Sequence, residues 1–222
     1  MTNTMVIDGL DEIEVENTSV EEIDSENVNL IFVGVDQSGS MYNHVADMKA
    51  CLADFRDAIT NSKEADEILL ARANFASTVE VSGYKNVGGF DVGYVSSGCT
   101  LMNDLIIDGE GKLLAYIAFL KAKGMRVKAV FALFSDGLDE GSQNPAHVAK
   151  ASVGRLNDAE VTTAFISFGG TAAGTAADYG FRNILTVGSS ASELRKAFNC
   201  LSKSVIESSK SVVADGDDFF QM

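Results

Sequence analysis

The stretch NLIFVGVDQSGSM, residues 29–41, joins a continuous apolar run to a polar turn. The run from Leu30 to Val35 has the length of a β-strand and lacks the polar alternation of a strand with one solvated face. It therefore predicts a strand of a parallel sheet that is buried on both faces. Beyond the turn, apolar residues recur at helical spacing over residues 42–60, which predicts an amphipathic helix.

The alternation of strand and helix continues to residue 208. Further strands are predicted at residues 68–75, 78–81, 127–134, 161–168 and 184–187, the first two of these forming a hairpin. One helix is predicted to end at Gly124 in a left-handed cap, and one to start with Asn144 as its cap. A capping box at residues 190–193 opens the last helix. This order predicts an α/β fold with a doubly wound, Rossmann-like, mostly parallel sheet and helices on both faces.

Three segments differ in composition. Residues 1–28 form an arm with nine acidic and no basic side chains, residues 29–208 form the domain, and residues 209–222 form a short acidic tail. Within the domain, residues 82–100 are rich in glycine and serine, and we expect a long functional loop there.

The net charge of −15 argues against nucleic acid and anionic membranes as partners. No apolar run approaches the roughly 18 residues of a membrane helix, and the first residues do not resemble a signal peptide. The three cysteines, Cys51, Cys99 and Cys200, match neither a disulfide framework nor a zinc site. We therefore expect a cytoplasmic protein.

Polar side chains follow the two most strongly apolar strands. Asp36, Ser38 and Ser40 come after the first, and Asp136 lies in a Ser-Asp-Gly turn after residues 127–134. The glycine-rich loop leads to Thr100. Because ligands of such sheets bind beyond the carboxyl ends of the strands, we expect these side chains to converge.

Carboxylate and hydroxyl oxygens, without an imidazole or a thiolate, form a hard ligand set that suits Mg²⁺ or Mn²⁺. With so few acids, the ion would keep waters and accept an outside carboxylate as its last ligand. This predicts adhesion rather than hydrolysis. A polar turn that only caps the following helix is the alternative interpretation of Asp36–Ser40. We expect neither His44 nor Asp104 to be a ligand.

The pattern Asp36-x-Ser38-x-Ser40, followed by Thr100 and Asp136, resembles the metal-ion-dependent adhesion site (MIDAS) of von Willebrand factor A (vWA) domains, over about residues 29–208. The resemblance implies that the two serines bind the metal directly and the two aspartates largely through water. Thr100 would bind directly or through water, depending on the conformational state. Cys99 departs from the pattern, because the family usually has a glycine before this threonine.

The resemblance implies a Mg²⁺-dependent protein-binding module that captures an Asp or Glu of its partner. It implies no enzyme, and the sequence offers no catalytic residues and no nucleotide-binding motif. Intracellular bacterial stand-alone members of the family work beside ring-forming ATPases, so the resemblance implies an AAA+ ATPase of the MoxR type as a partner class.

Two alternatives are open. The chain can be a scaffold or self-assembling subunit whose metal site is occupied by its own or a neighbour's arm, for example through Glu21 or Glu22. It can also be a phosphatase like the haloacid dehalogenases. That family needs a second aspartate two residues after the first, where this chain has Ser38, so no general acid is evident.

Overall fold

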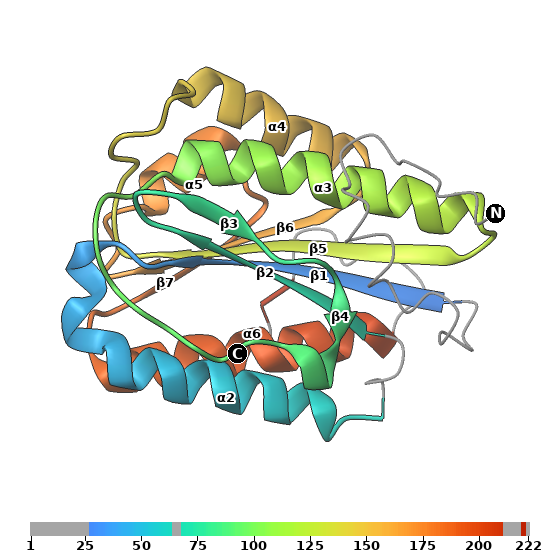
Figure 1. Cartoon of the computed structure of the whole chain (residues 1–222), viewed down its shortest axis with the longest axis horizontal. Coiled ribbons are helices and arrows are strands. Elements are labelled where there is room, and N and C mark those ends of the chain that lie inside the picture. The colour runs from blue at the N-terminus through green and yellow to red at the C-terminus, as the bar shows by residue number, and fades with distance from the viewer. Residues whose placement is uncertain (1–26, 64–67, 211–218, 221–222) are drawn as a thin grey trace, which may run out of the picture.

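The computed structural model describes residues 27–63, 68–210 and 219–220. Most of the predicted acidic arm and most of the acidic tail therefore lie outside the described residues. The described part is a three-layer α/β structure, in which one sheet lies between two layers of helices (Figure 1).

The sheet is mostly parallel. Its strands are β1 (Asn27–Asp36), β2 (Ile68–Phe75), β3 (Val79–Val81), β4 (Lys85–Asn86), β5 (Arg126–Ser135), β6 (Thr162–Phe168) and β7 (Asn183–Val187). The order is β3-β2-β1-β5-β6-β7, and β4 also pairs with β2. Strands β2, β1, β5, β6 and β7 run parallel, whereas β3 and β4 run antiparallel to β2. This confirms the predicted fold class and the hairpin of β2 and β3.

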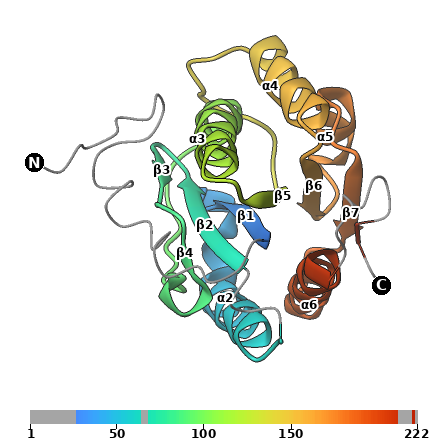
Figure 2. The ribbon, with the colours of Figure 1, turned by 90° about the vertical axis from the view of Figure 1, so that its right-hand side faces the viewer.

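Helices cover both faces of the sheet. They are α2 (Val45–Thr60), α3 (Met102–Ala122), α4 (Ala146–Asp158), α5 (Ala173–Tyr179) and α6 (Ala191–Lys210), with 3₁₀ turns η2 (Gly39–His44) and η4 (Val87–Gly89). Figure 2 shows α2 and α6 side by side on one face, and α3, α4 and α5 on the other. None of the described helices has the length and apolar character that crossing a membrane requires.

Strand β1 contributes to both cores, as its continuous apolar run predicts. Leu30 and Phe32 pack in the core on the side of α3, while Ile31, Val33 and Val35 pack in the core on the side of α2 and α6. All five side chains are buried. A strand that is buried on both faces has apolar residues at successive positions, whereas a half-exposed strand alternates apolar and polar residues.

Two helix ends form as predicted, and one differs by a residue. Gly124 has a φ of +87°, and Ser190 Oγ accepts a hydrogen bond from the Glu193 amide at 3.3 Å. The cap of α4, however, is Pro145 rather than Asn144. The Asn144 amide groups instead donate to the Asp104 carboxylate, at 3.0 Å from the backbone and 2.8 Å from the side chain.

Gly109 allows α3 to approach the sheet closely. A Cβ atom there would lie 2.5 Å from Phe32 Cζ and 2.9 Å from Phe131 Cε2, on two rings stacked 4.7 Å apart. Gly111, two residues further along the same helix, faces open space. The two glycines therefore form a matched pair for substitution.

We expect Gly109→Ala to lower the free energy of unfolding by about 1–2 kcal/mol, because the overpacking outweighs the gain in helix propensity. Gly111→Ala has only that gain and should raise the free energy of unfolding by about 0.5–1 kcal/mol. Urea denaturation of both variants measures the difference. Equal stability of the two would show that α3 is not held against the rings as described.

Phe219, beyond α6, packs into the domain. The Phe219 side chain is only 1% exposed, and its backbone amide donates to Asn183 Oδ1 at 2.9 Å. The Phe219 ring lies in the core on the side of α2 and α6, in contact with the Phe220 ring. The end of the predicted tail thus includes a buried residue beside the start of β7.

Candidate metal-binding site

The candidate site lies where the chain direction across the sheet reverses. From β1 the chain passes to β2 on one side, and later enters β5 on the other side of β1. Parallel strands leave a crevice beyond their carboxyl ends at such a point. Figure 1 shows β1 and β5 ending at the same edge of the sheet, where η2 begins and where the loop between η4 and α3 passes.

Asp36, the last residue of β1, is fully buried. Its Oδ1 accepts a hydrogen bond from the Ser38 amide at 2.8 Å, and its Oδ2 accepts one from Ser135 Oγ at 2.6 Å. Burial raises the pKa of the Asp36 carboxyl above its usual range; hydrogen bonds from Ser135 and Ser38 oppose this, and the charge of Asp136 adds to it. Within the described residues no lysine or arginine acts on this carboxyl. A bound cation would therefore relieve an uncompensated buried charge.

A row of oxygens leads from this buried aspartate to the surface. Ser38 Oγ and Ser40 Oγ lie 2.9 Å apart, and Ser40 Oγ donates to Asp136 Oδ1, also at 2.9 Å. Ser38 is buried, Asp136 is half-buried and Ser40 is exposed. An octahedral Mg²⁺ with bonds of about 2.0–2.1 Å places neighbouring ligand oxygens about 2.9 Å apart. The hydrogen bonds thus hold these oxygens at a spacing that suits the ion.

The glycine-rich loop is bonded to the turn after β1. Tyr94 Oη donates to the Asp36 carbonyl at 2.5 Å, and Ser96 Oγ donates to the Ser38 carbonyl at 2.6 Å. Two backbone hydrogen bonds extend the contact: Ser97 to the Gln37 carbonyl at 2.7 Å, and Gly39 to the Gly98 carbonyl at 3.0 Å. The loop therefore fixes the backbone from which the two serines project.

A buried arginine holds the base of this loop. Arg72, on β2, is 3% exposed; it donates from Nη1 to the Asp91 carbonyl at 2.7 Å and from Nε to Asn74 Oδ1 at 2.8 Å. Burial lowers the pKa of Arg72, and the nearby Asp91 and Tyr94 oppose this. Arg72 thereby acts as a positioning residue for the loop that carries Tyr94.

Thr100 lies beside the loop that follows β5. Its side chain is buried, and its backbone exchanges two hydrogen bonds with Glu140, at 3.2 and 2.8 Å. The preceding Gly98 contacts the turn at Gly39, so the Thr100 backbone lies near both strand-end loops. The structure records no hydrogen bond of the Thr100 hydroxyl with Asp36 or Asp136, and its role as a ligand stays a prediction.

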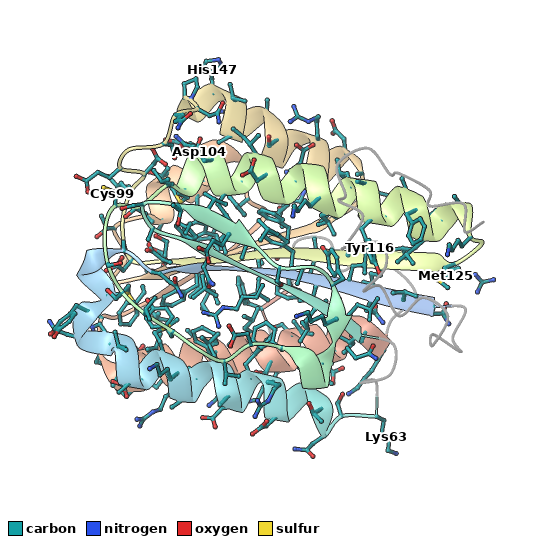
Figure 3. All side chains as sticks on the ribbon, in the orientation of Figure 1. Lys63, Cys99, Asp104, Tyr116, Met125 and His147 are labelled. Atoms are coloured by element: carbon teal, nitrogen blue, oxygen red, sulfur yellow. The ribbon has the colours of Figure 1, made fainter. Side chains whose placement is uncertain are left out.

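The residue before Thr100 does not require glycine here. Cys99 is exposed at this edge (Figure 3), and the positive φ of the segment, +81°, belongs to Gly98. A Cβ atom at Gly98 would collide with Ser77 Oγ, which instead accepts the Cys99 amide at 3.3 Å. The close backbone contact with Ser77 is thus made at Gly98, so Cys99 at the position of the family's usual glycine does not disturb it.

The other polar residues near the site have structural contacts. Asp104 accepts hydrogen bonds from the backbone of Gln143 and Asn144, and so fixes the loop before α4. The His44 ring packs edge-on against Phe168, with centroids 5.0 Å apart. Among the described residues no group of three or more His, Cys, Asp or Glu can hold a metal. Any ion at this edge therefore needs hydroxyl ligands too.

Comparisons with known proteins place the chain by its fold. No protein-family model matches, and neither does any curated protein. The pilus adhesin SpaC of Lactobacillus rhamnosus GG superposes with a TM-score of 0.65 at 12% identity, over 83% of this chain and 30% of that chain. Proximal thread matrix protein 1 of the mussel byssus, with a zinc-occupied MIDAS motif, superposes with a TM-score of 0.55 at 19% identity. The match covers 83% of this chain and 47% of that chain.

The von Willebrand factor domain of the type V pilus tip protein Mfa5 from Porphyromonas gingivalis gives a TM-score of 0.56 at 10% identity, over 81% of this chain and 95% of that domain. The chain spans less than half the length of the adhesin and of the byssus protein. These likenesses confirm the predicted fold: the chain has the fold of a von Willebrand factor A domain.

Proposed function

We propose that this chain is a Mg²⁺- or Mn²⁺-dependent protein-binding module in which Asp36, Ser38, Ser40, Thr100 and Asp136 hold the ion. The carrying observation is the row of oxygens that starts at a buried carboxylate without a cationic partner and ends at the surface. The zinc-occupied MIDAS of the byssus protein supports a divalent ion on this fold.

Each side chain has a defined part in this site. Asp36 and Asp136 supply negative charge, and the hydroxyls of Ser38 and Ser40 supply neutral oxygens at the correct spacing. Ser135 is a positioning residue, because its hydroxyl fixes the Asp36 carboxylate. When bound, the ion supplies a Lewis-acidic position that a partner's Asp or Glu completes. Because only two of the proposed ligands are carboxylates, that position stays attractive to an anion.

The cysteines support the cellular setting that we propose. Cys51 and Cys200 are buried, Cys99 is exposed, and all three are free thiols. Free thiols are typical of a reducing compartment, and we infer a cytoplasmic location, although SpaC is named as a pilus adhesin. For that location an AAA+ ATPase of the MoxR type remains the partner class that we propose.

The experiment is a calorimetric titration with Mg²⁺, and separately with Mn²⁺, of the wild type, Ser38→Ala and Ser189→Ala. Ser38→Ala should weaken binding by at least about tenfold, because it removes an oxygen from the ion's coordination. Ser189→Ala, in the exposed loop after β7, should bind as the wild type does. A MoxR-type ATPase, as candidate partner, should bind the wild type and the control in Mg²⁺ but not in EDTA.

Two results would contradict the proposal. Wild-type protein that binds neither ion has no such site, and Ser38→Ala with unchanged affinity binds the ion elsewhere. Neither serine belongs to the apolar cores, so we expect both variants to keep the fold. Circular dichroism verifies this.

A further inference from the structure

Three large apolar side chains are exposed around the candidate metal site. Within the described residues these are the exposed large hydrophobics: Tyr42 is 73%, Val95 64% and Leu138 50% exposed. Tyr42 lies in the 3₁₀ turn η2, Val95 in the loop that leads to Thr100, and Leu138 in the loop after β5. We call these three residues the apolar rim. Clustered exposed apolar side chains mark interaction surfaces, whereas isolated ones need no explanation.

Hydrogen bonds between their near neighbours bring the three segments together at the site. Tyr42 lies two residues after Ser40, and Leu138 two residues after Asp136, and the side chains of Ser40 and Asp136 are hydrogen-bonded at 2.9 Å. Val95 directly precedes Ser96, which bonds to the Ser38 carbonyl at 2.6 Å. The residues of the apolar rim therefore lie in the three segments that border the exposed end of the oxygen row.

The same loops are acidic. Residues 36–44, 87–101 and 135–145 contain no lysine or arginine, and their acidic residues are Asp36, Asp91, Asp136, Asp139 and Glu140. Arg72 lies 3.9 Å from Asp91, but it is buried and comes from β2. A divalent ion would offset only part of this charge. The remaining field attracts a basic segment and repels an acidic one.

We propose that the apolar rim and the metal site together bind a protein segment whose Asp or Glu is flanked by large apolar side chains and, beyond these, by lysine or arginine. The proposal rests on the proposed function, because the ion must hold the carboxylate. The apolar neighbours then pack on Tyr42, Val95 and Leu138. The outer basic residues face the acidic loops.

The chain's own acidic arm fits this description less well. It has carboxylates with apolar neighbours but no basic residue. Glu21 and Glu22 lie outside the described residues, and the chain from Glu21 to Asn27 spans at most about 22 Å. Strand β1, from Asn27 to Asp36, is about 30 Å long. Within one copy this segment would therefore have to run fully extended along β1, which disfavours these two glutamates as ligands of their own site.

The test uses synthetic nine-residue peptides and fluorescence anisotropy in excess Mg²⁺. The first peptide has a central Glu flanked by leucines, with lysines at both ends. The second replaces the leucines with serine, the third replaces the lysines with glutamate, and the fourth is residues 18–26 of this chain. We expect the first to bind at least about tenfold more tightly than each of the others. The second peptide loses the packing of the leucines, which contributes more than about 1.4 kcal/mol, and the third and fourth lose the attraction of lysine to the acidic loops.

The protein variants separate the rim from the ion. The triple variant Tyr42→Ser, Val95→Ser, Leu138→Ser should lose the preference for leucine over serine while its calorimetric Mg²⁺ affinity is unchanged. Met125→Ser removes a partly buried apolar side chain at the opposite end of the sheet (Figure 3) and should keep the preference.

Each other outcome has a distinct meaning. Equal binding of the leucine and serine peptides overturns the role of the rim. Mg²⁺ binding without any peptide binding overturns this inference but leaves the metal site standing, whereas absence of Mg²⁺ binding overturns the proposed function. Tightest binding of residues 18–26 shows that the occupant is the acidic arm of this chain, which overturns the basic partner.

Discussion

Replacing Asp36 with asparagine is expected to abolish the stabilisation that Mg²⁺ gives the wild-type protein. At an ion concentration one hundred times Kd, the wild type should gain about 2.7 kcal/mol. For a chain of this size, that gain corresponds to a rise of about 5–10 °C in Tm. Asp36→Asn removes the buried charge that the ion compensates, so its Tm should not respond to Mg²⁺.

The same substitution should have a small effect in EDTA. Burial raises the pKa of the Asp36 carboxyl, which shows that the charged form is disfavoured in the metal-free protein. Asparagine has no charge to desolvate, but it can accept only one of the two hydrogen bonds from Ser38 and Ser135. These effects oppose each other, and we expect the free energy of unfolding to stay within about 1 kcal/mol of the wild type.

Thermal unfolding in EDTA and in Mg²⁺ measures both effects. Asp158→Asn provides the control, because Asp158 is an exposed carboxylate at the end of α4 and should leave the Mg²⁺ response intact. An equal Mg²⁺ shift in Asp36→Asn and the wild type would place the ion elsewhere. A large loss of stability in EDTA would mean that the aspartate is mainly a structural hydrogen-bond acceptor.

Phe219→Ala is expected to destabilise the domain by about 3–5 kcal/mol, the usual cost of removing a buried phenylalanine ring. The ring is 1% exposed and packs in the core on the side of α2 and α6. Phe220→Ala is the matched control, because the Phe220 ring is only partly buried and should cost clearly less. Guanidinium denaturation measures both variants.

If Phe219→Ala had the same guanidinium midpoint of unfolding as the wild type, this residue would not stabilise the core. The expected loss instead makes the end of the chain part of the folded domain. Sequence composition places Phe219 in an acidic tail, because three aspartates precede it closely and no periodic pattern surrounds it. Its burial depends on the hydrogen bond and packing beside β7.

The strands follow from local sequence to within a few residues. The predicted strand at residues 68–75 is β2, Ile68–Phe75, and the predicted run from Leu30 to Val35 is the centre of β1. Helix α5, Ala173–Tyr179, was not predicted, because it contains alanine, glycine and threonine and buries only Ala176 and Tyr179. A helix this short lacks the repeated large apolar residues that reveal the helical period.

The site is predictable only in part. Asp36 ends β1, and Ser38, Ser40 and Asp136 lie just after strand ends; the structure joins all four in one hydrogen-bonded group. That Thr100 binds the ion remains a prediction. The sequence did not predict Ser135, Tyr94 and Arg72 as part of the site. Ser135 is the serine of the Ser-Asp-Gly turn, but no role was assigned to it. Their roles depend on partners far away in the chain, such as Asp36 for Ser135.

Periodicity and strand-end chemistry, both readable within a few neighbouring residues, were sufficient for most strands and helices and for the sheet edge at which Asp36, Ser38, Ser40 and Asp136 lie together. That these oxygens bind an ion stays a prediction. Tertiary structure alone decided that Asp36 is buried without a cation, that Tyr42, Val95 and Leu138 are exposed, and that Phe219 enters the core. The reason is that burial and charge compensation depend on which distant segments the fold brings together, and no local pattern encodes that proximity.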